Sequence, residues 1–276
     1  MSEITIGFAK IGNIGSAPLI EFLLDERAER EDIDVIVVGS GSKILSKHAK
    51  RVAQQVVDLK PNLIVMTTPN ASLKAPLEAM EIFKESKIPT IIVSDSPAKK
   101  AIQKIEEMDL GYLIVEPDAM IGARKEFLDP VEMAIFNADI IKILAITGVF
   151  NILTKEINGV IESLKQKKPI LPKIIIDREL SASAANFLNP YAKSKAFASF
   201  ELAKVVAKLN IEGCFMQKDW KEYTNTVASA HEILRIATRL ADEARELEKG
   251  NDSIFRSPHS SGGKLLQKRK LIEKPK

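Results

Sequence analysis

The sequence predicts an α/β protein: a doubly wound, mostly parallel sheet domain, then a helical domain and a short C-terminal β segment. Three observations lead to this fold class. Short β-branched runs alternate with stretches of helical spacing in the first part of the chain, long stretches of helical spacing dominate the second part, and the C-terminal residues flank a Ser-Ser-Gly-Gly turn. Continuous apolar runs joined by helices are typical of parallel strands buried on both faces.

The first domain, expected over residues 1–128, contains five runs rich in β-branched residues. They are 4–8, 33–38, 63–66, 90–93 and 112–115. Helical spacing separates them, as in 19–29, 77–84 and 98–108. Right-handed crossovers would place the carboxyl ends of all five strands on one edge of the sheet, where open α/β sheets bind ligands.

The second domain, expected over 129–250, is mainly helical. Asp129 is a good N-cap before Pro130, and Glu132 stands at the third helical position, which resembles a capping box. Residues 173–176 are predicted to form a strand that can return to the sheet. Residues 251–276 are expected to be an extended hairpin that turns at 260–263 and packs on other parts of the protein.

Composition excludes several classes of protein. With 45% apolar and 28% charged residues and a net charge of +3, the chain of 276 residues is an ordinary globular protein with no predicted nucleic-acid partner. A single cysteine and three histidines give little support for a disulfide scaffold or a four-ligand zinc site. The apolar stretch 140–153 is too short to span a membrane, and the run 4–8 is too short for a signal peptide. We therefore expect a cytoplasmic protein without metal or membrane partner.

Small, polar, turn-forming residues follow each of the first four predicted strands. Such segments leave backbone N–H groups free and let a ligand approach closely, although they also serve as plain turns and helix caps. The residues that we expect to bind a cofactor are Lys10, Gly12, Asn13, Ile14, Gly15, Thr68, Pro69, Asn70, Asp95, Ser96 and Pro97. The glycines suit an anionic ligand but do not specify NAD, because Lys10 replaces the first glycine of the dinucleotide fingerprint and no acidic residue ends the second strand.

Polar residues of the following region are candidates for substrate binding. Asp118 and Arg124 lie in a loop beside Gly122, where they could be structural or could face a ligand. His231-Glu232 does not extend to the metalloprotease pattern, because Arg235 stands at the position of the second histidine. A lone helical histidine is more often structural than a ligand.

Several stretches together resemble the F420-dependent methylenetetrahydromethanopterin dehydrogenases of methanogenic archaea. These are 10–15, the long run 110–139, 211–215, 227–232, 240–249, Asn251-Asp252 and 256–259. Two departures are small: Thr67-Thr68 precede Pro69 where a glycine pair is expected, and Ser96 replaces an alanine.

This resemblance implies reversible hydride transfer from methylenetetrahydromethanopterin to coenzyme F420, a deazaflavin, as a step in making methane from carbon dioxide. It implies no metal, and it implies a homo-oligomer, with a hexamer as the expected size. A carboxylate beside the developing cation would help, and Asp129 or Glu132 is expected in that role. The pterin is expected to contact Asp118, Arg124, Asn137 and His231.

Three other interpretations stay open at this stage. An NAD(P)-dependent dehydrogenase could share the architecture, and a cofactor-binding regulator could lack turnover. A helical subunit of a larger complex is the third, because alanines dominate one face of the last predicted helix.

Overall fold

The structure, a computed structural model, describes residues 3–26 and 29–276, which form two compact units. The first unit comprises Met1–Val115, Leu153–Ile176 and Ser257–Leu266, as far as these are described. The second comprises Glu116–Ile152, Asp177–Arg256 and Gln267–Lys276. The division therefore differs from the predicted ranges 1–128, 129–250 and 251–276, because two later segments of the chain pack into the sheet unit.

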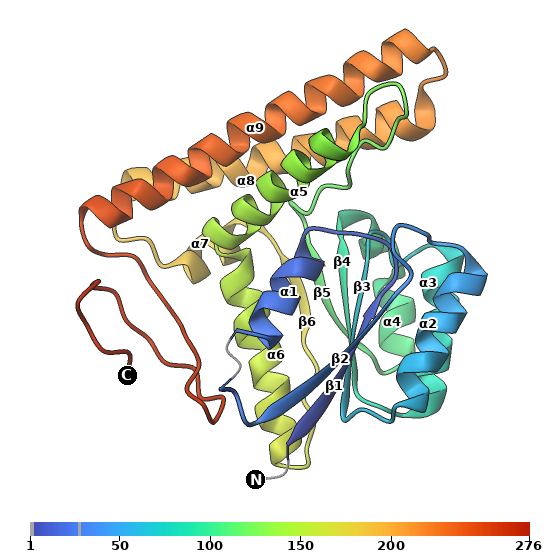
Figure 1. The fold of residues 1–276 in the computed structure, drawn as a ribbon, viewed down its shortest axis with the longest axis vertical. Helices are drawn as coiled ribbons and strands as arrows, with labels where there is room; N and C mark the ends of the chain where they lie inside the picture. The colour runs from blue at the N-terminus through green and yellow to red at the C-terminus, as the bar shows by residue number, and fades with distance from the viewer. Residues whose placement is uncertain (1–2, 27–28) are drawn as a thin grey trace. The chain divides into compact units, whose positions relative to one another are not determined.

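The first unit contains a six-stranded sheet in the order β2-β1-β3-β4-β5-β6 with every pair parallel, which confirms the predicted α/β class (Figure 1). The strands are β1 (Ile4–Lys10), β2 (Ile33–Gly39), β3 (Leu63–Thr68), β4 (Thr90–Asp95), β5 (Gly111–Val115) and β6 (Lys173–Ile176). The strand predicted at 173–176 is thus β6, and it pairs with β5 at one edge of the sheet.

Helices cover both faces of this sheet. On one face lie α2 (Ser46–Asp58), α3 (Lys74–Ser86), the 3-10 turn η1 (Ser96–Ala101) and α4 (Ile102–Glu107). On the other lie α1 (Ser16–Leu24) and α6 (Val149–Lys165), of which residues from 153 onward belong to this unit (Figure 1). Because both faces are covered, every residue of β3 and β4 is buried, whereas exposed and covered residues mix along the edge strands β2 and β6.

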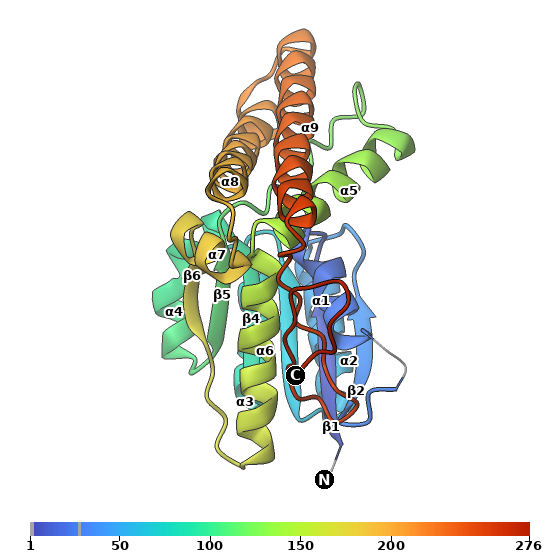
Figure 2. The ribbon, with the colours of Figure 1, turned by 90° about the vertical axis from the view of Figure 1, so that its left-hand side faces the viewer.

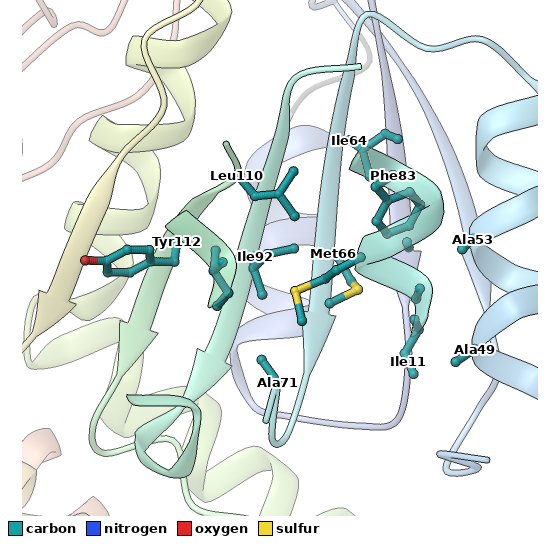
Figure 3. Packing of buried hydrophobic residues seen from close by; sticks show 14 of the residues in the cluster. Ile11, Ala49, Ala53, Ile64, Met66, Ala71, Phe83, Ile92, Leu110 and Tyr112 are labelled. Carbon is teal, nitrogen blue, oxygen red and sulfur yellow. The ribbon is translucent and has the colours of Figure 1, made fainter. Parts of the chain in front are cut away.

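The core between the sheet and α2, α3 and α4 combines medium-sized side chains with alanines. Figure 3 shows Met66 and Ile92 from the strands meeting Phe83 of α3, while Ala49 and Ala53 let α2 approach closely. Each of these five side chains is fully buried. Close packing of this kind fixes where the strands end, and therefore where the turns that follow them lie.

The second unit is helical. It contains α5 (Pro130–Ile146), α7 (Arg178–Ala185), α8 (Pro190–Ile211), the π-helical turn η2 (Glu212–Met216) and α9 (Trp220–Gly250). Helices α8 and α9 lie side by side (Figure 2). The predicted stripe of small residues explains this packing, because Ala230, Ala237, Ala241 and Ala244 of α9 are fully buried and keep the helices close.

The C-terminal segment forms the predicted hairpin. Antiparallel bridges join Arg256 to Lys268 and His259 to Leu265. In the first unit, the hairpin tip packs on the chain before β2: Glu31 N–H donates to the Ser261 carbonyl at 3.0 Å, and a β-carbon on Gly263 would lie against the Asp32 carboxylate. Glycine is therefore required at the tip.

Asp32 is also held by two cations of the first unit. Its carboxylate accepts hydrogen bonds from Arg30 at 2.8 and 3.1 Å and from Lys165 of α6 at 3.1 Å. Burial raises the pKa of Asp32, but the hydrogen bonds and charges of Arg30 and Lys165 outweigh it and bring the pKa down to about 2.

No single helix among the described residues is long and apolar enough to cross a bilayer, although the bent pair α5 and α6 has the necessary length and composition when taken together.

Candidate active site

The order of the strands marks one place at the carboxyl edge of the sheet as the expected ligand site. The chain leaves β1 for β2 on one side, and β3 lies on the other side of β1, so the winding direction reverses between β1 and β3. In open α/β sheets, ligands bind outside the carboxyl ends of the strands at such a switch point. The turns after β1 and β3, which contain most of the predicted cofactor residues, meet here.

Gly12 is the most constrained residue of the turn after β1. It has a φ of +79°, and a β-carbon there would lie 2.8 Å from two Ile44 side-chain carbons and 3.0 Å from Pro69 Cδ. Its N–H donates to Ser40 Oγ at 3.1 Å, and the preceding Ile11 N–H donates to the Thr67 carbonyl at 2.9 Å. The turn is therefore hydrogen-bonded to residues at the ends of β2 and β3, and only glycine fits at position 12 without strain.

The remaining residues of this turn differ in exposure. Asn13 is exposed, whereas Ile14 is buried and anchors the turn in the core. Gly15 is the N-cap of α1 and adopts an ordinary helical backbone conformation. Asn13 is thus the side chain of the turn that is free to meet a ligand.

Two threonines at the end of β3 carry buried hydroxyl groups. Thr67 Oγ1 and Thr68 Oγ1 have no hydrogen-bond partner within residues 3–26 and 29–276, and both residues are fully buried. The neighbouring turn is well bonded: Ser94 Oγ donates to the Thr68 carbonyl at 2.7 Å and accepts from Ala71 N–H at 3.1 Å. Buried hydroxyls normally find partners, so these two are suited to hydrogen-bond a bound molecule.

The other predicted cofactor residues of the first unit lie close to this edge. Lys10 forms an ion pair with Glu21 of α1 at 2.8 Å, so its charge is already matched. Asn70 Oδ1 accepts from Ser72 N–H at 3.0 Å and from Ser72 Oγ at 2.6 Å and shapes the turn after Pro69. Asp95 ends β4 with only 6% of its surface exposed, and Ser96 and Pro97 begin η1 directly after it.

All of the remaining predicted site residues belong to the second unit, where α5 and α9 share an ionic cluster. Asp129 caps α5, as predicted, by accepting from Glu132 N–H at 2.7 Å. The Glu132 carboxylate accepts from Arg235 at 2.8 and 2.9 Å and contacts His231 Nδ1 at 2.8 Å. Sequence reasoning missed Arg235, yet its position four residues after His231 places both on one face of α9.

His231 is 2% exposed and packs against the rings of Phe127 and Phe136, whose centroids lie 4.8 and 4.5 Å away. Burial lowers the pKa of His231, and the opposing effect of Glu132 does not cancel it. The imidazole is therefore neutral near pH 7, with its proton on Nδ1 facing the Glu132 carboxylate. His231 Nε2 is then an acceptor, and it has no hydrogen-bond partner among the described residues.

Three other predicted substrate residues have clear local contacts or burial. Arg124 donates to the Gly213 carbonyl at 2.7 and 2.9 Å and stacks over the Tyr223 ring at 4.0 Å, so it holds η2 in place. Asn137 donates to the Met133 carbonyl of its own helix at 2.7 Å. Asp118 lies in a loop, as predicted, and is completely buried.

Comparisons with known proteins cover almost the whole chain. A family model described as methylene-5,6,7,8-tetrahydromethanopterin dehydrogenase matches residues 4–276. An F420-dependent methylenetetrahydromethanopterin dehydrogenase of Archaeoglobus fulgidus is 49% identical over 273 residues, and one of Methanocaldococcus jannaschii is 46% identical over 274 residues, with 99% of each chain covered in both cases.

A solved structure is similar over the same length. It is that of an F420-dependent methylene-tetrahydromethanopterin dehydrogenase in complex with methylene-tetrahydromethanopterin and coenzyme F420. It matches with a TM-score of 0.97 and 44% identity, and it covers 100% of both chains. Since sequence and fold agree from one end of the chain to the other, the protein belongs to the methylene-5,6,7,8-tetrahydromethanopterin dehydrogenase family.

Proposed function

We propose that this protein transfers a hydride reversibly between 5,10-methylenetetrahydromethanopterin and coenzyme F420. The products of the forward reaction are methenyltetrahydromethanopterin and reduced F420, in methanogenesis from carbon dioxide. The observation that carries this function is the full-length likeness, at 44% identity, to an enzyme solved with both reactants. Shared fold alone would not be enough, but here the likeness covers the sequence as well as the fold over the whole chain.

The first unit fits F420 as a co-substrate. The turn at Gly12 presents backbone without a side chain, and the Thr67 and Thr68 hydroxyls are buried without partners in the described part of the chain. We assign F420 binding to this edge, with residues 12–15, 68–70 and 95–97 around it, because it is the switch point of the sheet. When bound, the deazaflavin supplies a ring carbon that accepts or returns the hydride.

The reaction requires little covalent help from the protein. The methylene carbon of the pterin lies between two nitrogens, so departure of the hydride leaves a stabilised cation. The protein residues have mainly to orient the reactants and exclude water, and orientation alone can supply much of the acceleration. A fixed carboxylate near the developing positive charge would lower the barrier further.

Asp129 is our candidate for that carboxylate. It is exposed apart from its capping bond, and it forms no ion pair with any described residue, so its negative charge is not matched by a cation. Glu132, the other predicted candidate, is matched by Arg235. We therefore assign to Glu132 the role of a positioning residue, which fixes the tautomer and orientation of His231.

We assign pterin recognition to the second unit. His231 Nε2 is a buried acceptor without a partner among the described residues, and the amide and amino groups of a pterin ring are donors. Asp118 and Asn137 are the further residues proposed near the pterin. Arg124 contributes by holding η2 through the Gly213 carbonyl.

A homo-oligomer, with a hexamer as the expected size, is also part of this proposal. Several large apolar side chains of the second unit are exposed, and such groups commonly mark subunit interfaces. They are Val131, Met133, Ile135, Phe215, Met216 and Trp220. Light scattering on the purified protein tests the size of the assembly.

A cytoplasmic location is the last part of the proposal. It is based on the single cysteine in the chain, because disulfide-bonded proteins of oxidising compartments usually contain several.

The function is tested by mixing the purified protein with oxidised F420 and methylenetetrahydromethanopterin while the visible absorbance of the deazaflavin is followed. We expect bleaching that depends on the pterin. Folded protein that fails to bleach F420, but reduces NADP with the same pterin, would overturn the assignment of the acceptor. Failure with both acceptors would overturn the enzyme function.

A further inference from the structure

Five cationic side chains of the first unit lie in the loop after β2, on α2 and at the start of α3. They are Lys43, Lys47, Lys50, Arg51 and Lys74, all of them exposed, and we call them the basic patch. The loop that begins the patch packs directly on the turn after β1, because Ile44 lies against Gly12 and Ser40 Oγ accepts from Gly12 N–H. The patch is therefore continuous with the switch point of the sheet.

The charges of the basic patch are poorly balanced. Lys50 and Lys74 share one carboxylate, that of Glu78, at 3.6 and 4.0 Å. Lys43, Lys47 and Arg51 form no ion pair within the part of the chain that the structure describes. Lys47 and Arg51 are four residues apart on α2, a spacing at which like charges destabilise a helix. A surface that retains such repulsion is suited to bind a polyanion.

The pKa of His48 on α2 is affected by the positive charges of the basic patch. Its pKa is lowered by desolvation and by the charges of Lys47, Lys43 and Arg51. Lys10, in contrast, is neutralised by Glu21 at 2.8 Å. An anion that extends from the Gly12 turn would therefore meet net positive charge on the α2 side rather than at Lys10.

We propose that the basic patch binds the polyanionic tail of the deazaflavin co-substrate and thereby selects tailed F420 over deazaflavins without a tail. This inference rests on the proposed function, since it concerns the same site. Beyond its ring system, F420 carries a phosphodiester and a short chain of glutamates, so its tail is flexible and repeatedly negative. Exposed lysines suit such a partner because they need no fixed geometry to neutralise it.

The test is a binding titration without pterin, followed by the fluorescence of the deazaflavin. The probes are oxidised F420 and its precursor that lacks the phosphate and glutamates. The variant carries Lys43→Ala, Lys47→Ala and Arg51→Ala together. The matched control carries Lys84→Ala, Lys104→Ala and Lys168→Ala, which removes the same charge from other described parts of the first unit.

We expect the patch variant to bind F420 about tenfold more weakly at low salt and to bind the tailless precursor as the wild type does. The control should match the wild type with both probes. The difference should vanish near 1 M salt, where the screening length falls to about 3 Å. An unchanged affinity for F420, or an equal loss with both probes, would overturn the inference.

The outcome is separate from the test of the proposed function, because binding requires no turnover. If the wild type reduces F420 and the patch variant binds it normally, only this inference fails. If the wild type prefers tailed F420 through the patch but never reduces it, the inference stands and the proposed reaction fails.

Discussion

The two units present their candidate residues by different means. At the carboxyl edge of the sheet in the first unit, the candidate site consists mainly of backbone, glycine and small hydroxyl side chains at strand ends. In the second unit, Glu132, His231 and Arg235 form an ionic cluster between two long helices. A site formed mainly by backbone groups is sensitive to substitutions that add side-chain volume. A site formed by charged side chains is sensitive to substitutions that remove a charge but keep the shape of the side chain. Substitutions of these two kinds should therefore affect the units differently.

The largest effect is expected from added volume at the switch point. Gly12→Ala introduces a β-carbon 2.8 Å from Ile44 and displaces the turn, so we expect kcat/KM for F420 to fall on the order of 100-fold. Steady-state kinetics with varied F420 measure it. Gly41→Ala is the matched control, because Gly41 also has a positive φ, +62°, but a β-carbon there meets nothing within 4 Å. If both variants lose activity equally, backbone strain rather than crowding is responsible.

Neutralising Asp32 tests whether charge matters in the first unit away from its turns. The pKa of Asp32 is lowered from 3.8 to about 2, so its stabilising contribution is complete above pH 4 and is lost as the pH falls through 2. Asp32→Asn should therefore cost about 2 kcal/mol at pH 7, and its cost should shrink below pH 4. Denaturant unfolding at several pH values measures this. A cost equal to that of the exposed Asp34→Asn would contradict the assigned ion pairs.

Neutralising Asp129 tests the electrostatic role proposed for the second unit. Asparagine caps helices as well as aspartate, so Asp129→Asn should leave stability nearly unchanged. We expect kcat to fall about tenfold, because the carboxylate acts on the developing cation, while the Kd for F420 stays constant. Unfolding and single-turnover kinetics on the same protein separate the two effects. Full turnover in a variant that binds both reactants would remove Asp129 from this role.

The smallest effect is expected from Glu132→Gln, which keeps the shape of the cluster. Loss of the charge should cost about 1 kcal/mol of stability, because Arg235 is partly exposed. Glu132 raises the pKa of His231 against burial, so the variant should have a still lower His231 pKa in an NMR titration.

The pH dependence of stability follows from the same pKa. In the wild type, the stability that neutral His231 contributes is complete above the ordinary histidine pKa. This stability is lost as the pH falls through the lowered pKa that His231 has in the folded protein. In Glu132→Gln the loss should extend to lower pH. An unchanged titration would mean that the contact between Glu132 and His231 is absent in solution.

The strands and caps could be predicted from the sequence because their causes are local. The β-branched runs give β1 to β5, and Asp129 before Pro130 gives the capped start of α5. The contacts within the candidate sites could not be predicted in the same way. Glu132 and Arg235 are 103 residues apart, and the sequence around either residue does not predict its contact with the other.

The boundaries of the units were also beyond local reasoning. The predicted first domain ended at residue 128, but the sheet unit ends its first segment at Val115 and regains Leu153–Ile176 later. The strand at 173–176 and its possible return to the sheet could be predicted from its apolar run, but its neighbour in the sheet could not. Pairing of β6 with β5 depends on tertiary packing, which periodicity does not encode.

The hairpin tip at Ser257–Leu266 completes the first unit, although it follows the long helices α8 and α9 of the second unit along the chain. During synthesis, the first unit therefore cannot be completed until those helices have been made. Neither unit corresponds to one continuous stretch of the gene, so neither can be expressed by a single truncation.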